Sequence, residues 1–212
     1  WGARPYHLPE YLHATNWTVN QGIKFLKKRD PSKPFFLKLS FARPHSPYDP
    51  PEFYFNMYAD KELPKPAIGE WVEECEQKVT ALDAWNRKLT DEELKRAKAG
   101  YYGSITHIDT QIGRFLFALK REKLLDDTLI IFTSDHGDML GDHNLLRKTY
   151  AFEGSAHIPM LVVLPKNMRN SIKNRKVNVP VQLQDIFPTI LDILGESIPE
   201  DLDGKSMFRL IK

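Results

Sequence analysis

A helical repeat of apolar residues over positions 94–121 is the feature that most constrains the fold of this 212-residue chain. Its apolar members recur at a period near 3.6 and lie on one helix face; they are Leu94, Ala97, Tyr101, Ile105, Ile108, Ile112, Phe115 and Leu119. Thr90 and Glu93 stand just before the repeat in the pattern of a capping box, which predicts the start of the helix. Gly100 and Gly103 are poor helix formers, so they favour a division of the element into two helices.

Short apolar runs alternate with further helical patterns along the chain. Helical periods occur at 15–29 and at 183–194, where Pro188 suits a first turn and Gly195 suits a stop. The apolar runs are typical of strands and lie at 35–41, 129–133 and 160–164. This alternation predicts an α/β domain with a largely parallel sheet flanked by helices, its strands buried on both faces. Six prolines within 43–66 predict a long irregular segment.

Composition excludes several classes of function. The 30 basic and 28 acidic residues give a net charge of +2 and are mixed along the chain, which argues against nucleic acid or a membrane surface as partner. The longest apolar runs are far shorter than a membrane span. Cys75 is the single cysteine, so no internal disulfide forms, and its acidic neighbours disfavour a thiolate nucleophile.

The densest group of reactive side chains directly follows the apolar run 129–133. Asp135-His136 stands at its end, where strands of an α/β sheet give way to ligand-binding loops. A carboxylate and an imidazole held by a rigid strand can bind a divalent cation, although an ordinary Asp-His-Gly turn also explains this pair taken alone. Arg147-Lys148 adds positive charge, and Glu153-Gly154-Ser155 follows. Asp138, Asp142 and Arg147 in this loop could orient ligands or contact a substrate, but loop residues of this kind are more often solvated surface residues.

In this order, the motifs resemble the sulfatases of the alkaline-phosphatase superfamily. The late metal-binding element of that family reads as strand, Ser-Asp-His-Gly or Ser-Asp-Asn-Gly, loop, Lys, Glu-Gly and strand, and residues 130–159 follow it. Pro44-His45-Ser46-Pro47 resembles the family's Pro-His-x-Pro segment, and residues 101–113 and 183–206 resemble its later helices and closing turn. The resemblance covers nearly the whole chain and implies an alkaline-phosphatase-like fold.

The resemblance also implies a role for each matching residue. Asp135 and His136 are two expected ligands of a divalent cation; calcium is the commonest in the family, and the imidazole of His136 also suits manganese, magnesium or zinc. Lys148 is expected to hold the sulfate oxygens. His45 is expected to contact the sulfate and to protonate the leaving alcohol. His143, between the metal pair and Lys148, ranks first among further substrate-binding candidates.

Other features of the family are absent from the sequence. It contains no Cys/Ser-x-Pro/Ala-x-Arg segment, which sulfatases convert to the nucleophile formylglycine, and no early aspartate pair. Residues 1–212 are therefore expected to form the later part of a catalytic domain, with the early part and a small C-terminal subdomain absent. The formylglycine is expected in that absent part, and the isolated chain is expected to be inactive. His157 stands where the family commonly has Arg.

We therefore expect a fragment of a metal-dependent sulfuric-ester hydrolase that acts on sulfated glycans or aryl sulfates. A phosphodiester or phosphonate monoester hydrolase of the same superfamily is the alternative enzyme, because the Asp-His form of the metal motif also occurs there. A non-catalytic sulfate-binding remnant is the alternative from another class. Like other members, the protein is expected in the periplasm, the lysosome or the exterior.

Overall fold

The computed structural model describes residues 2–75, 86, 88–148, 150–169 and 176–211. The chain divides into two compact units. The first unit comprises Trp1–Leu125 and His136–Ile158, and the second comprises Asp126–Asp135 and Pro159–Lys212.

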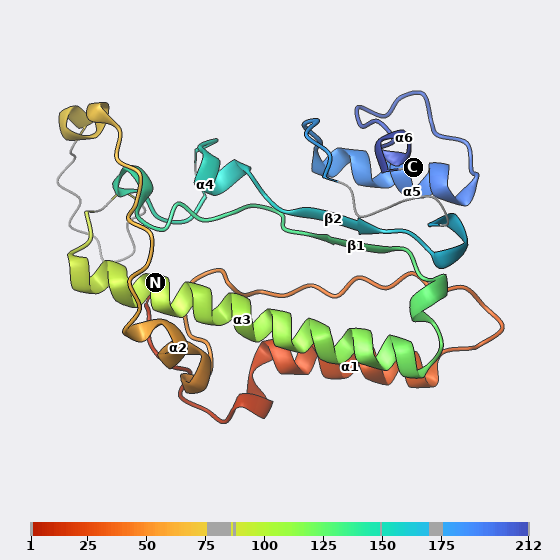
Figure 1. Cartoon of the computed structure of the whole chain (residues 1–212), viewed down its shortest axis with the longest axis horizontal. Coiled ribbons are helices and arrows are strands. Elements are labelled where there is room, and N and C mark those ends of the chain that lie inside the picture. The colour runs from red at the N-terminus through yellow and green to blue at the C-terminus, as the bar shows by residue number, and fades with distance from the viewer. Residues whose placement is uncertain (1, 76–85, 87, 149, 170–175, 212) are drawn as a thin grey trace. The chain divides into compact units, whose positions relative to one another are not determined.

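The first unit is built on helices. Its α-helices are α1 (Ala14–Lys28), α2 (Glu52–Ala59), α3 (Asp91–Arg121) and α4 (Glu153–Ala156), with short 3-10 turns η1 (Glu10–Leu12), η2 (Glu70–Cys75) and η4 (Asp142–Asn144). Both α1 and α2 pack against α3, which is 31 residues long (Figure 1). The helix predicted at 15–29 is therefore confirmed as α1. The prediction of an irregular segment over 43–66 is wrong in part. The helix α2 forms within it, directly after its fourth proline, Pro51.

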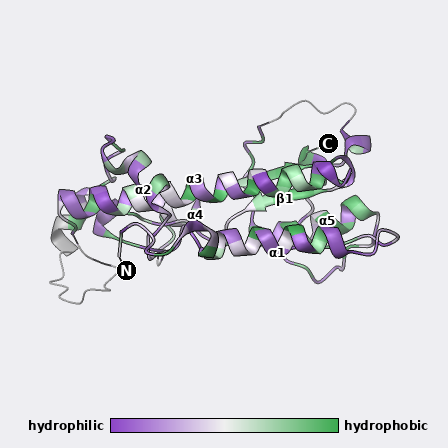
Figure 2. Ribbon diagram, turned by 90° about the horizontal axis from the view of Figure 1, so that it is seen from below, coloured by the Kyte–Doolittle hydropathy of each residue, from purple (hydrophilic) through white to green (hydrophobic). Residues whose placement is uncertain are grey.

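The capping box predicted for the long helix is confirmed. The Thr90 hydroxyl accepts a hydrogen bond from the Glu93 backbone N–H at 3.2 Å, and the Glu93 carboxylate accepts one from the Thr90 N–H at 2.9 Å. The division predicted at Gly100 and Gly103 is wrong, because α3 runs without a break. Its ribbon alternates hydrophobic and hydrophilic residues, as expected for a helix with one covered face (Figure 2).

Two of the three glycines of α3, Gly100 and Gly103, allow a close approach of the backbone. A Cβ at residue 100 would lie 2.5 Å from the carbonyl oxygen of Tyr48, and one at residue 103 would lie 2.7 Å from that of Tyr54. Such distances exclude any side chain at these two positions, so only glycine lets the segment 48–54 lie on α3.

The strand predicted at 35–41 is extended but joins no ladder in the described part of the chain. Its residues alternate between half-buried and exposed, and Phe36 is 80% exposed. The segment packs through Leu39 where α1 meets α3: a Cβ added at Gly22 would lie 2.8 Å from Leu39 and 3.1 Å from Phe115. The apolar run predicted the extended backbone correctly, but a ladder also needs a neighbouring strand, which no local pattern supplies.

The second unit holds a pair of strands and a helix. The strands β1 (Ile130–Thr133) and β2 (Met160–Val163) pair in antiparallel register, with Ile130 opposite Val163. The parallel pairing predicted for the sheet is therefore wrong for these two described strands. Burial on both faces is also wrong for them, because Leu161 is 59% and Phe132 39% exposed, although β1 is coloured hydrophobic in Figure 2.

The helix predicted at 183–194 is confirmed as η6 (Leu183–Asp185) followed by α5 (Ile186–Leu194), which ends at Gly195 with a left-handed φ of 75°. The Asp185 carboxylate accepts hydrogen bonds from the backbone N–H groups of Gln182 and Lys205, each at 2.8 Å. This carboxylate fastens the turn before the short helix α6 (Phe208–Ile211) to the start of α5.

A buried polar cluster joins α1 to α3. His13, the N-cap of α1, and His107 of α3 are each 1% exposed, and their ring centroids are 4.9 Å apart. His107 Nε2 donates to the side-chain oxygen of Asn16 at 2.7 Å, and Tyr54 stacks on the same imidazole at 4.8 Å. Burial, and secondarily the neighbouring His13, lower the pKa of His107 to about 4. The core therefore accommodates a neutral imidazole.

Two glycines of α3 provide a matched test of the close approach. In the complete protein we expect Gly100→Ala to lower the free energy of unfolding by about 1–3 kcal/mol, because the new methyl group meets the Tyr48 carbonyl. Gly113→Ala is the control, since no atom lies within 4 Å of its added Cβ. There the better helix propensity of alanine should raise stability by about 0.5–1 kcal/mol. Urea unfolding measures both; equal effects would contradict the close approach.

The buried imidazole of His107 should also make stability depend on pH. Because folding lowers its pKa from 6.5 to about 4, the unfolded chain binds the proton more readily. The contribution of the neutral His107 to the free energy of unfolding is therefore fully present above pH 6.5, and it is lost as the pH falls from there towards 4. We expect His107→Gln to flatten the decline in unfolding free energy over this range, measured by urea titration at several pH values. A decline as steep as that of the wild type would refute this assignment.

Candidate active site

The loop at 137–148 carries or adjoins most of the predicted site residues, and its backbone is strained. Non-glycine residues with positive φ are Leu140, His143, Asn144 and Arg147, with values of 44°, 53°, 58° and 65°. Each such residue costs on the order of 1–3 kcal/mol, and such strain collects at functional sites. Hydrogen bonds close the loop on itself, from Met139 N–H to the Arg147 carbonyl at 2.7 Å and from Gly141 N–H to the Leu145 carbonyl at 2.9 Å.

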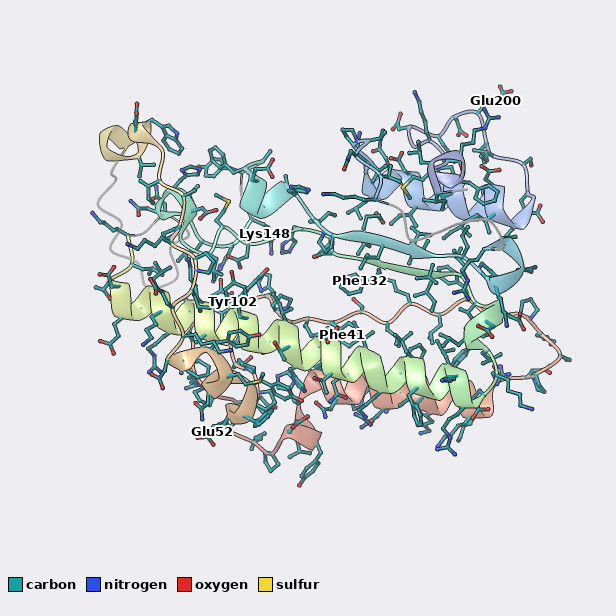
Figure 3. The ribbon with its side chains drawn as sticks, in the orientation of Figure 1. Phe41, Glu52, Tyr102, Phe132, Lys148 and Glu200 are labelled. Atoms are coloured by element: carbon teal, nitrogen blue, oxygen red, sulfur yellow. The ribbon has the colours of Figure 1, made fainter. Side chains whose placement is uncertain are left out.

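Three of the predicted site residues meet in the first unit. Lys148 Nζ donates to His45 Nε2 at 2.7 Å, across 103 residues of sequence. The ring of His45 lies edge-on to that of His136, with centroids 5.8 Å apart and an interplanar angle of 72°. Lys148 is exposed on the segment that leads into α4 (Figure 3). The cluster thus joins a cation, a proton-carrying group and a metal-competent imidazole.

Backbone carbonyls orient both imidazoles. His45 Nδ1 donates to the carbonyl of Ser46 at 2.9 Å, and His136 Nδ1 donates to the carbonyl of Gly137 at 2.7 Å. In a neutral ring the lone pair then resides on Nε2. For His45 this is the nitrogen that accepts from Lys148. For His136 it is the nitrogen with the chemistry of a metal ligand, and metal-binding histidines typically donate their other nitrogen in this way.

Asp135 and His136 fit part of a divalent metal centre. Asp135 is an exposed carboxylate that follows β1 after one residue, and His136 adds an oriented imidazole. Within the described residues, no group of three or more His, Cys, Asp and Glu side chains is arranged to hold a metal ion. Oxygen and nitrogen donors of this kind suit the cations named above, but further ligands would be needed to complete the coordination sphere.

Glycines set the position of the backbone at His136. Gly137 N–H donates to the carbonyl of Ser155 at 2.7 Å, and a Cβ at Gly137 would lie 2.1 Å from the Gly154 carbonyl oxygen. A Cβ at Gly154 would in turn lie 3.2 Å from the Asp138 carbonyl oxygen. The Glu-Gly-Ser motif therefore has a physical reason, since its glycine lets the start of the loop pack on α4.

His143 is placed in an aromatic cluster. Its ring centroid lies 5.1 Å from that of Trp71 and 4.8 Å from that of Phe152, and its Nδ1 accepts from the Gly69 N–H at 3.0 Å. These contacts hold the tip of the loop against the segment that includes η2. No described contact joins His143 to His45 or Lys148, so its substrate-binding role stays a prediction.

Tyr48 and Asp138, which the sequence did not rank among the site residues, link the loop to the segment of His45. Asp138 accepts hydrogen bonds from the Tyr48 hydroxyl, the Leu140 N–H and the Arg147 N–H. The bond to the N–H two residues on is an Asx-type turn, which is a recognisable local signal in sequence. The bond to Tyr48 spans 90 residues and has no such signal.

His157, which stands where the family commonly has Arg, pairs with Glu153. His157, the C-cap of α4, places its Nδ1 2.7 Å from Glu153 Oε2, and the two side chains are 78% and 88% exposed. An exposed pair of this kind contributes little to stability.

Comparison with known proteins defines the class. The chain matches the sulfatase family over residues 3–196. It is 50% identical over 214 residues to an arylsulfatase of Clostridium perfringens. The alignment covers 100% of this chain and 44% of that protein. A choline-sulfatase of Rhizobium meliloti is 32% identical over 213 residues, covering 95% of this chain and 41% of that one. The chain belongs to the sulfatase family.

Solved structures agree on the fold. The phosphonate monoester hydrolase of Agrobacterium radiobacter superposes with a TM-score of 0.84 at 32% identity, covering 99% of this chain and 45% of that one. The predicted alkaline-phosphatase-like fold is thereby confirmed. The chain spans less than half the length of each of these relatives. None of the described helices is long and apolar enough to cross a membrane.

Proposed function

We propose that the protein containing this chain hydrolyses sulfuric esters, with aryl sulfates or sulfated glycans as substrates. The observation that carries the proposal is the meeting of Lys148, His45 and His136 in one cluster. The 50% identity to an arylsulfatase favours sulfate esters over phosphonate esters, for which the corresponding identity is 32%.

The residues of this chain supply charge neutralisation and a proton. An ammonium group has three N–H donors, so Lys148 can hold oxygens of the bound sulfate from its place beside His45. His45, oriented by the Ser46 carbonyl, presents Nε2 as the atom that protonates the departing oxygen.

A divalent cation held by Asp135 and His136 would, when bound, polarise the ester and stabilise the negative charge that develops in the transition state. Asp135 supplies a charged oxygen ligand, and the Gly137 carbonyl keeps His136 in the tautomer that such a ligand needs. The expected formylglycine nucleophile would come from outside residues 1–212.

The acid role of His45 predicts a loss that depends on the leaving group. In the complete protein, His45→Ala should lower kcat about a hundredfold to ten-thousandfold for a sugar or alkyl sulfate. It should lower kcat less for nitrophenyl sulfate, whose anion leaves without a proton. His157→Ala is a control, because that exposed imidazole pairs only with Glu153 among the contacts described. Equal losses on both substrates would rule out the acid role.

Relative rates on three ester classes separate the candidate functions. We expect kcat/KM of the complete protein to be higher for nitrophenyl sulfate than for a phenylphosphonate monoester or a phosphate diester. The reverse order would establish the phosphonate or phosphodiester hydrolase, an alternative favoured by the similarity to the Agrobacterium enzyme. Tight binding of sulfate esters with no turnover of any substrate would indicate the binding remnant.

A further inference from the structure

A hydrogen bond joins the two segments that bring the site residues together. The Tyr48 hydroxyl donates to Asp138 Oδ2 at 2.8 Å. Tyr48 stands three residues after His45, and Asp138 stands two residues after His136. The bond therefore connects the segment of the candidate acid to the loop of the candidate metal ligand.

The second oxygen of the same carboxylate fixes both ends of the loop. Asp138 Oδ1 accepts from the Leu140 N–H at 2.9 Å and from the Arg147 N–H at 3.0 Å. Arg147 directly precedes Lys148, so the three donors come from the His45 segment, the start of the loop and the residue beside the lysine. Hydrogen bonds to an ionised acceptor are stronger than those between neutral groups.

Tyr48 is itself a fixed point. It is 1% exposed, its N–H donates to the Gly2 carbonyl at 2.7 Å, and its own carbonyl accepts from the Arg4 N–H at 3.2 Å. Burial, and then the negative charge of Asp138, raise the pKa of Tyr48, so its hydroxyl keeps the proton that it donates.

The segment that carries His45 is closed on itself as well. The Arg43 guanidinium pairs with the Asp49 carboxylate at 2.5 Å, and the two side chains are only 18% and 13% exposed. This ion pair closes the segment 43–49, which contains both His45 and Tyr48.

We propose that Tyr48 and Asp138 are positioning residues, and that their hydrogen bond holds His45 Nε2 in register with Lys148 and His136. The inference rests on the proposed function, because its kinetic effect is exerted through His45. The loop at 137–148 contains several residues in unfavourable backbone conformations, so it needs external ties to keep one arrangement. Without the Tyr48 tie, the loop and the His45 segment lose a direct bond between them. Displacements near 1 Å can cost about a hundredfold in rate.

The variants Tyr48→Phe and Asp138→Asn test the hydrogen bond between these two side chains, called the brace below, in the complete protein. Tyr48→Phe removes only the hydroxyl from a buried ring. We expect kcat to fall about tenfold to a hundredfold for a sugar or alkyl sulfate. For nitrophenyl sulfate, which needs no proton from His45, we expect a loss of less than about threefold. Because Asp138→Asn affects the same tie, the double variant should lose less than the product of the single losses.

Tyr58→Phe is the matched control. The Tyr58 hydroxyl hydrogen-bonds to the Thr106 hydroxyl at 2.7 Å and joins α2 to α3, so this variant removes a tyrosine hydroxyl from a neutral hydrogen bond that lies in neither site segment. We expect a smaller fall in melting temperature than in Tyr48→Phe and unchanged kcat on both substrates. If Tyr48→Phe behaves like Tyr58→Phe, or lowers kcat equally on both substrates, Tyr48 and Asp138 are structural only and the proposal is overturned.

A second measurement separates this proposal from the proposed function. If the wild-type protein cleaves no sulfate ester, the proposed function fails, and the brace is then tested by amide hydrogen exchange. Faster exchange of the Leu140 and Arg147 amides in Tyr48→Phe than in Tyr58→Phe would support the brace. Equal exchange in the two variants would overturn it.

Discussion

The backbone of residues 48–54 lies directly on α3, with the carbonyl oxygens of Tyr48 and Tyr54 where side chains at 100 and 103 would otherwise stand. This approach brings Tyr48 into the core, where it packs with Ala97 of α3 and with Leu140. Leu140 belongs to the loop of the candidate site, and Tyr48 follows His45 by three residues. A single core contact therefore orients both segments from which the site is built.

The loop at 137–148 depends on those surroundings energetically. Its left-handed residues each cost on the order of 1–3 kcal/mol. Hydrogen bonds to the charged Asp138 contribute about 1.5–3 kcal/mol apiece, and the ring contacts of His143 with Trp71 and Phe152 about 0.5–1.5 kcal/mol each. The terms are of similar size, so the loop keeps its shape only while its contacts persist. A loop fixed in advance presents Lys148 without the entropic cost of ordering it on binding.

Local patterns predicted the local features of this fold. The capping box at Thr90, the stop at Gly195 and the apolar runs of β1 and β2 are each encoded within a few residues. Features that depend on distant partners were not readable: Gly100 looked like a helix breaker because the sequence does not show which backbone lies against it. Likewise, the Asx turn of Asp138 is local, whereas its bond to Tyr48 is not. The meeting of His45 with Lys148 followed from a family resemblance and not from any spacing.

The hydrogen bond between Lys148 and His45 constrains how the proposed acid would be charged. In this arrangement the lone pair of His45 Nε2 accepts a hydrogen bond from the ammonium group, so Nε2 cannot at the same time carry the proton that a leaving oxygen needs. The oxygens of a bound sulfate ester can accept from Lys148 in place of His45 Nε2, which is then free to take up a proton from solvent. In the proposed reaction, the substrate would therefore bind to Lys148 and, by doing so, allow His45 Nε2 to act as the acid.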